Sequence, residues 1–208
     1  MRGRLWAKTV GFAWILSSTA GYAGTDFGRV AQLTSSAAID GTATDTYVAT
    51  VTNGAGTWIA TWASSDVAAG VTPGTSMAVV SRSIDDGTTW SAPSVVRSEF
   101  VNLHGARPAV ATDTHGVWAI AWGDLSDVYV SFSTDSGETW GPPSTLVSGG
   151  VNVGPSIATD GSGTWIVAWD SVNNIGGADQ DILYARSSDQ GETWSAPAFL
   201  NTTGASDV

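Results

Sequence analysis

The chain of 208 residues has a formal net charge of -11 and no cysteine, with 11 Trp and 25 Gly against only 8 Lys and Arg. This acidic balance argues against nucleic acid or an anionic membrane surface as a partner, because both bind clustered cations. The absence of cysteine excludes a disulfide framework and thiolate metal sites. A hydrophobic content of 42% predicts a packed core.

The first segment, residues 1–23, has the pattern of a secretory signal peptide. Basic residues and no acidic one precede the apolar stretch 10–16, and small residues follow as far as Ala23. This order is typical of an export signal. The alternatives are a short core helix or a membrane anchor, but the apolar stretch is too short to cross a bilayer. We expect cleavage after Ala23, no membrane span in the mature chain, and a secreted or periplasmic location.

An eight-residue string, Ser-x-Asp-x-Gly-x-Thr-Trp, then recurs at nearly equal spacing along the chain. The Asp can accept backbone N–H groups of a turn, and the Gly supplies a positive φ. The Trp returns onto the sheet as an apolar plate. We therefore predict a hairpin turn at each copy. The residues that recur are Ser83, Asp85, Gly87 and Trp90, then Ser133, Asp135, Gly137 and Trp140, then Ser187, Asp189, Gly191 and Trp194.

A second motif, Gly-x-Trp-x-x-x-Trp, keeps step with the first. It occurs at 56–62, 116–122 and 163–169. The side-chain period of two in a strand places both Trp of each copy on one sheet face. We interpret these pairs as core between neighbouring sheets, because every repeat carries one and the burial of such rings is strongly stabilising. The alternative is a platform on which sugars stack.

Each repeat therefore contains four short strand-like runs, exemplified by 155–159, 164–169, 181–187 and 194–200. Four antiparallel strands in a repeat of this length are typical of a propeller blade. The sequence predicts an all-β fold, a partial β-propeller of about three four-stranded antiparallel blades. Its expected parts are an N-terminal strand and linker at 24–45, blade 1 at 46–102, blade 2 at 103–150, blade 3 at 151–200, and the start of a further repeat at 201–208.

The eight-residue strings resemble the Asp-box, or BNR, repeats of the sialidase superfamily, a resemblance that covers residues 46–200. In that family the boxes are structural and lie at the outer edge of the propeller, away from the active site. The resemblance implies the propeller fold. It implies an exo-alpha-sialidase activity only as an alternative, because a fold hosts many functions.

The catalytic pattern of that family is not evident in this chain. Sialidases hold the substrate carboxylate with three arginines, use a Tyr paired with a Glu as nucleophile, and use an Asp as acid/base. The arginine motif Phe/Tyr-Arg-Ile/Leu-Pro has its nearest match in Ala106-Arg107-Pro108, which follows the first box instead of preceding it. Glu99, Glu138 and Glu192 stand at no telling distance from a Tyr. The candidates for carboxylate binding are Arg82, Arg107 and Arg186.

Two of these arginines, Arg82 and Arg186, stand directly before a box serine. A position that recurs in repeats usually serves the scaffold, which favours packing over substrate binding.

Paired carboxylates in the loops before the third strands are the only metal candidates. Asp124 with Asp127, and Asp179 with Asp181, could hold Ca²⁺ together with backbone carbonyls. Turn capping is the alternative that we favour. We expect no resident metal and no cofactor.

Three blades do not close a propeller. We therefore expect a fragment of a longer reading frame, with edge-to-edge self-association as the alternative. The functional hypothesis is a secreted, non-catalytic scaffold or module that contacts glycans or cell-surface protein. The alternative is a sialidase-type glycoside hydrolase with part of its active site outside this chain.

Overall fold

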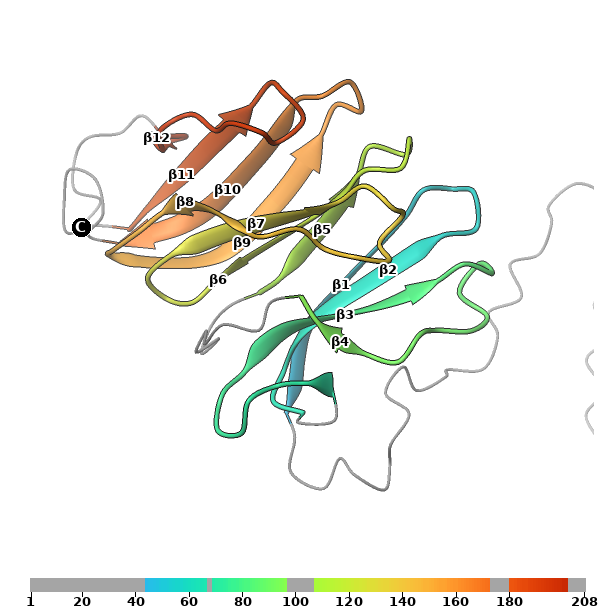
Figure 1. Ribbon diagram of the computed structural model, residues 1–208. Helices are drawn as coiled ribbons and strands as arrows, with labels where there is room; N and C mark the ends of the chain where they lie inside the picture. Colours follow the sequence, from blue (N-terminus) through green and yellow to red (C-terminus); the bar gives the residue numbers. More distant parts are fainter. Residues whose placement is uncertain (1–43, 67–68, 97–106, 173–179, 202–208) are drawn as a thin grey trace, which may run out of the picture. The chain divides into compact units, whose positions relative to one another are not determined.

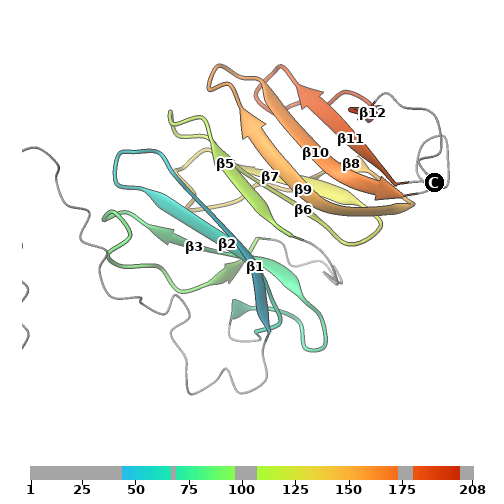
Figure 2. The ribbon, with the colours of Figure 1, turned by 180° about the vertical axis from the view of Figure 1, so that it is seen from behind.

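The computed structural model describes residues 44–66, 69–96, 107–172 and 180–201, which form three four-stranded antiparallel sheets (Figures 1 and 2). The predicted all-β fold of three four-stranded blades is confirmed. Blade 1 contains β1 (Asp45–Thr52), β2 (Trp58–Ser64), β3 (Met77–Ser83) and β4 (Ser94–Val95). Blade 2 contains β5 (Ala109–Thr112), β6 (Trp118–Gly123), β7 (Val128–Ser133) and β8 (Ser144–Val147). Blade 3 contains β9 (Val151–Thr159), β10 (Trp165–Val172), β11 (Gln180–Ser187) and β12 (Ala198–Phe199).

The predicted signal peptide at 1–23, nearly all of the linker at 24–45, and residues 202–208 of the last predicted part lie outside the described residues. Within the part of the chain that the structure describes, no helix is long and apolar enough to cross a membrane.

The turn between the first and second strands has the same hydrogen bonds in all three blades. In blade 3, Asp160 Oδ1 accepts the backbone N–H groups of Ser162 and Thr164 at 2.8 and 3.0 Å. Asn53 in blade 1 and Asp113 in blade 2 accept the corresponding N–H groups. An Asp or Asn side chain closes such a turn on its own, so each first hairpin forms locally.

The fourth strand of each blade is shorter than the sequence predicts. The predicted run 194–200 contains only the two paired residues of β12, Ala198 and Phe199. Before them, Ser195 N–H still bonds to the carbonyl of Arg186. Pro197 then interrupts the ladder, because proline has no N–H to donate.

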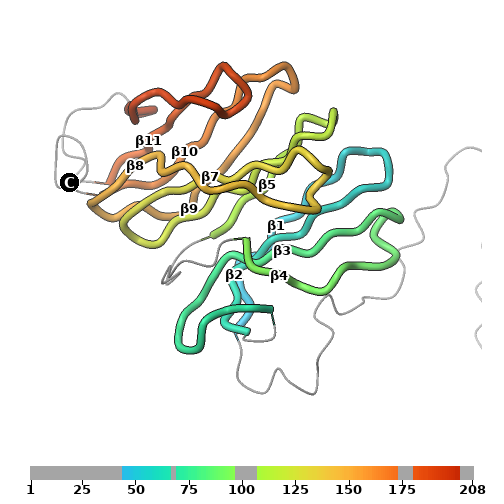
Figure 3. Tube along the Cα trace, viewed as in Figure 1, coloured from blue at the N-terminus to red at the C-terminus, as the bar shows by residue number. Residues whose placement is uncertain are grey.

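The core lies between the blades. We call the face that carries the two Trp of the second strand the tryptophan face of a blade, and the opposite one its back face. The back face of blade 1 packs on the tryptophan face of blade 2, and the back face of blade 2 packs on the tryptophan face of blade 3; Figure 3 traces the chain through the three sheets. Trp118, Trp122, Trp165 and Trp169 are at most 1% exposed. The interpretation as inter-blade core is confirmed for these two Trp pairs, but it is wrong for Trp58 and Trp62, which do not lie between two of the described blades.

The tryptophan face of blade 1 is covered differently. Trp62 is buried in a cluster with Ala69 and Val71, which belong to the loop between β2 and β3. Trp58 is only half-buried. A segment of blade 1 itself therefore covers the part of this face around Trp62, which a neighbouring sheet covers in the other two blades.

The box glycines meet the preceding blade closely. A Cβ atom at Gly191 would lie 2.3 Å from Phe132 Cζ, and one at Gly137 would lie 2.4 Å from Ile59 Cδ1. A Cβ at Gly87 would meet nothing nearer than its own Trp90, at 3.9 Å. The φ angles are similar, at +79°, +80° and +89° for Gly87, Gly137 and Gly191. In the second and third boxes the glycine therefore serves close packing as well as the turn.

Replacing each box glycine by alanine separates these two roles. Gly87→Ala should lower the free energy of unfolding by about 1 to 2 kcal/mol, the cost of a left-handed non-glycine residue. Gly137→Ala should cost more, and Gly191→Ala most, because a methyl group there must displace the rigid ring of Phe132. Urea unfolding measures the three differences. Equal losses in all three variants would contradict the inter-blade role.

Candidate functional site

The strand register gives each blade two distinct ends. In blade 1, Thr52 pairs with Trp58 and Trp58 with Ser83, at the end that carries the box. Asp45 pairs with Ser64 and Ser64 with Met77, at the other end. We call the first of these the box end and the second the loop end, because in each blade the second strand ends and the third begins there. The first strands β1, β5 and β9 are neighbours, so their loop ends are adjacent.

The three boxes form the same hydrogen-bonded turn. In the first, Ser83 Oγ donates to Asp85 Oδ1 at 2.8 Å and accepts the N–H of Gly87 at 2.9 Å. Thr89 donates its N–H to Asp85 Oδ1 at 2.8 Å and its hydroxyl to Asp85 Oδ2 at 2.6 Å. The same four bonds recur around Asp135 and Asp189. Both oxygens of each box carboxylate are thus used inside the turn.

These bonds also change the acidity of the box aspartates. Donation from Thr89 lowers the pKa of Asp85 from 3.8 to about 2, and donation from Thr193 lowers the pKa of Asp189 to the same value. The pKa of Asp135 is lowered for the same reason. A carboxylate held ionised by turn donors is suited to a structural role and unsuited to proton transfer.

The structure does not bring the three candidate arginines together. Arg82 and Arg186 lie near the box ends of blades 1 and 3, on β3 and β11, with blade 2 between them. Arg82 Nε donates to the backbone carbonyl of Ser136 in the box of blade 2 at 2.7 Å. Arg107 precedes β5 and lies at the loop end. These placements give no cluster of three cations for one carboxylate.

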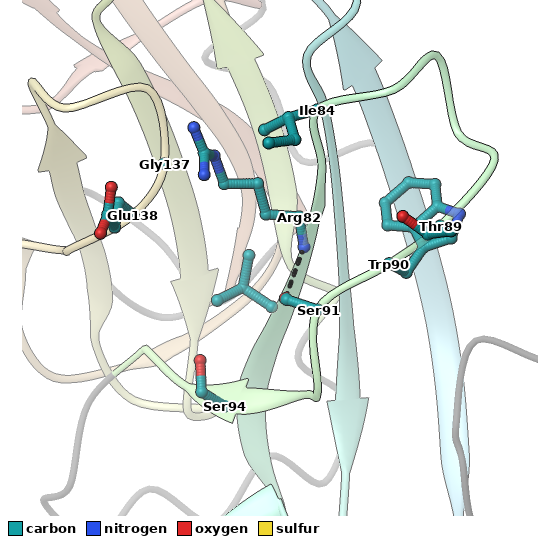
Figure 4. Close-up of a pocket in the computed structure, with 9 residues that line it drawn as sticks. Arg82, Ile84, Thr89, Trp90, Ser91, Ser94, Gly137 and Glu138 are labelled. Carbon is teal, nitrogen blue, oxygen red and sulfur yellow. Dashed lines mark hydrogen bonds between the residues drawn. The ribbon is translucent and has the colours of Figure 1, made fainter.

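A groove of about 380 Å³ lies beside Arg82 between blades 1 and 2 (Figure 4). Figure 4 shows the Arg82 side chain reaching toward the turn that carries Gly137 and Glu138, while Thr89 and Trp90 lie apart on the first box. The Arg82 guanidinium is already bonded to the turn, so the groove is the edge of an inter-blade contact.

At the loop end, Arg107 and Tyr47 form an exposed pair. The guanidinium carbon of Arg107 lies 5.1 Å from the centroid of the Tyr47 ring, within reach of a cation–π interaction. Tyr47 is 45% exposed and Arg107 is exposed. Tyr47 in β1 and Arg107 in the segment before β5 occupy equivalent positions in the repeats of blades 1 and 2. A cation and an aromatic face are thus presented together to solvent.

The backbone at Tyr47 is strained. Its φ is +59°, inside the β-bulge where the β1–β2 register shifts between Thr46 and Ala49. The equivalent bulge of blade 3 has glycine there, Gly154 with φ +60°. A tyrosine with positive φ is uncommon and costs free energy, and such residues concentrate at functional sites.

A second loop-end cluster joins Asp124, Asp127 and Tyr129. The Tyr129 hydroxyl lies 3.1 Å from Asp124 Oδ2 and 3.0 Å from Asp127 Oδ2. The other oxygens accept turn amides, Asp124 Oδ1 from Ser126 and Asp127, and Asp127 Oδ1 from Gly149. Burial raises the pKa of Tyr129, and the two carboxylates raise it further. The phenol therefore stays protonated and donates.

These contacts bear on the calcium candidates. Asp124 and Asp127 cap their own turn, and Asp181 Oδ1 accepts a hydrogen bond from Asn201 at 3.0 Å. Asp179 lies outside the described residues. The residues that the structure describes contain no group of three His, Cys, Asp or Glu placed to hold a metal ion.

Comparison with solved structures shows which known folds the blades resemble. The chain is 19% identical to a Hadza microbial sialidase, covering 72% of this chain and 36% of the sialidase with a TM-score of 0.52. It is 18% identical to the GH93 alpha-L-arabinofuranosidase of Fusarium graminearum, covering 74% and 48% with a TM-score of 0.55. It is 21% identical to an alpha-L-arabinanase of Penicillium chrysogenum, covering 76% and 50% with a TM-score of 0.55.

The chain has the fold of a partial β-propeller. It spans between 36% and 50% of the length of these three glycosidases. No protein-family model and no curated protein sequence matches it. The likeness extends to an arabinofuranosidase and an arabinanase as well as a sialidase, so it shows the propeller fold of glycosidases without singling out sialidases.

Sequence reasoning missed Tyr47 and Tyr129 as site residues. Tyr47 could have been found by aligning the first strands of the repeats, where it takes the position of Arg107 and Gly154. The Tyr129 cluster depends on the conformation of a loop, and its only sequence signal was the Asp124–Asp127 pair.

The lowered pKa of the box aspartates predicts an acid dependence of stability. Because the folded pKa of Asp85 is about 2 and the usual value is 3.8, its stabilisation is complete above the usual value and is lost as pH falls toward 2. The melting temperature should therefore drop steeply through this window. Asp85→Asn should melt lower at neutral pH and show a shallower drop.

Asp86→Asn is the matched control, since it removes the same charge one residue along without removing a box acceptor. If both variants keep the steep acid dependence of the parent chain, the box hydrogen bonds are not its source.

Proposed function

We propose that this chain is an exported, non-catalytic propeller module that contacts carboxylate-bearing glycans at its loop end. The observation that carries the proposal is the exposed pair of Arg107 and Tyr47, with ring and guanidinium 5.1 Å apart. The propeller fold, which the chain shares with glycosidases, supports a role at carbohydrates.

The pair matches the chemistry of an acidic sugar. A guanidinium can donate two parallel hydrogen bonds to a carboxylate, and the adjacent ring offers an apolar face to the C–H groups of a pyranose. Strain at Tyr47 supports this role, because glycine would satisfy the bulge at lower cost, as it does at Gly154. The chain as a whole is acidic, so it attracts an anionic ligand only where such a local cation is exposed.

The state of the carboxylates favours binding over hydrolysis. Glycoside hydrolases need two carboxyl groups free to act as acid and as base or nucleophile. Asp124 and Asp127 are both occupied by turn amides and by Tyr129. Among the described residues, the only glutamates are Glu138 and Glu192, which belong to boxes at the opposite end. A Tyr129 with a raised pKa is also a poor nucleophile.

Binding of defined sugars tests the proposal. The ligands for calorimetric titration are N-acetylneuraminic acid, a glucuronic acid disaccharide and neutral arabinobiose. At least one of the two acidic sugars should bind, and arabinobiose should not. Arg107→Ala and Tyr47→Ala should each weaken that binding about ten-fold or more, since both remove a direct contact. Arg186→Ala removes another exposed arginine, near the box end of blade 3, and should leave the affinity unchanged. Acidic-sugar binding that persists in Arg107→Ala would refute the site.

A glycoside hydrolase is the second candidate, favoured by the two carboxylates that share the Tyr129 hydroxyl. Retaining enzymes also place two carboxyl groups close together. Fluorogenic sialoside and arabinofuranoside substrates decide between the two functions. We expect no turnover by the full chain. Turnover that disappears in both Asp127→Asn and Tyr129→Phe would replace the binding module by an enzyme.

A further inference from the structure

We propose that the glycan bound at the loop end is an acidic sugar joined to a neutral sugar, with the neutral sugar over Gly154 and beside the Asp170 carboxylate. This class of ligand rests on the proposed function, because it takes the pair of Arg107 and Tyr47 as the place of the acidic sugar. It adds to that pair a third position, on the neighbouring first strand.

The bulges of blades 1 and 3 have the same structure. The register shifts opposite Trp62 in blade 1 and opposite Trp169 in blade 3. Each indole donates its N–H at 3.1 Å to the Asp or Asn side chain two residues before the first bulge residue. The first bulge residue has nearly the same φ in both blades, +59° and +60°. Gly154 therefore has in blade 3 the place that Tyr47 has in blade 1.

Tyr47, Arg107 and Gly154 form a row at the loop end. The first two are in contact, with ring and guanidinium 5.1 Å apart. Strand β5, which follows Arg107, contacts both β1 and β9, as Figure 2 shows from behind. Because the three residues are equivalent in their repeats, Gly154 lies beside Arg107 on the side away from Tyr47. A ligand held by Arg107 can extend over this position.

The surface at Gly154 is open except for one carboxylate. Apart from its chain neighbours, a Cβ atom at Gly154 would have one described atom within 4 Å, Asp170 Oδ2 at 3.4 Å. Asp170 is half-buried in β10, and none of the described residues donates a hydrogen bond to it. Carboxylate oxygens accept hydroxyl groups in charge-assisted hydrogen bonds, which are stronger than neutral ones. A sugar over Gly154 would thus place its hydroxyl groups against a free acceptor.

The charges of Arg107 and Asp170 determine which sugar lies at which position. The guanidinium attracts a carboxylate, whereas the Asp170 carboxylate repels one at short range and accepts hydroxyl groups instead. A glycan with an acidic sugar at Arg107 and a neutral sugar at Gly154 satisfies both groups. A glycan made only of acidic sugars places like charges together at Asp170.

Calorimetric titration with matched sugars tests this order. One pair is glucuronic acid and glucuronosyl-xylose, and another is N-acetylneuraminic acid and sialyllactose. In at least one pair, the ligand that contains neutral sugar should bind about ten-fold more tightly than the acidic sugar alone. Digalacturonic acid should bind no more tightly than galacturonic acid, because Asp170 repels its second carboxylate.

Variants at the third position locate the neutral sugar. Asp170→Ala should bring the affinity ratio within the pair close to one, because the acceptor is lost. Gly154→Tyr should do the same by filling the space, and Tyr47 shows that tyrosine adopts this φ. Asp170→Asn should let digalacturonic acid bind more tightly than galacturonic acid. Asp86→Asn removes the same charge at the box end and should leave every ratio unchanged.

The outcomes separate this inference from the proposed function. A ratio near one in the parent chain, with single-sugar binding that Arg107→Ala removes, would overturn the neutral-sugar position and leave the proposed function standing. A ratio that persists in both Asp170→Ala and Gly154→Tyr would also overturn it, since the neutral sugar would then lie elsewhere. If none of the acidic sugars binds, the proposed function itself is wrong, and the neutral-sugar position with it.

Discussion

The fold depends on the contact between each Asp-box turn and the blade before it. A four-stranded sheet of this size buries little apolar surface alone, so its stability comes from the tryptophan face that it lays on its neighbour. The box turn sets how closely the two sheets approach, because its glycine leaves no room for a side chain against Ile59 or Phe132. The hydrogen bonds of Ser, Asp and Thr that hold that turn in shape lie within the box itself and need no group of the neighbouring blade.

The sequence was sufficient for features governed by local periodicity. The recurring boxes and the Trp spacing predicted three antiparallel four-stranded sheets, and the buried pairs Trp118–Trp122 and Trp165–Trp169 lie where that spacing placed them. The second role of Gly137 and Gly191 was not predictable in this way. Each meets a residue of the preceding repeat, and that approach depends on how two sheets stack.

The loop end was still less accessible to sequence reasoning. The alternation of apolar and polar residues does not reveal Tyr47, because a positive φ inside a bulge leaves no mark in that pattern. Arg107 was visible as an incomplete arginine motif, but its partner became evident only from the adjacency of β1 and the segment before β5. The candidate site is therefore built from residues that are distant in sequence, as are the sites of many repeat proteins.

The bond from Arg82 ends on a main-chain oxygen, and this choice of acceptor leaves the side chain at that position free to vary. The three boxes indeed carry Asp86, Ser136 and Gln190 there, all with left-handed backbone. A substitution at residue 136 therefore leaves the acceptor of this bond in place, so the contact between blades 1 and 2 is insensitive to the side chain there.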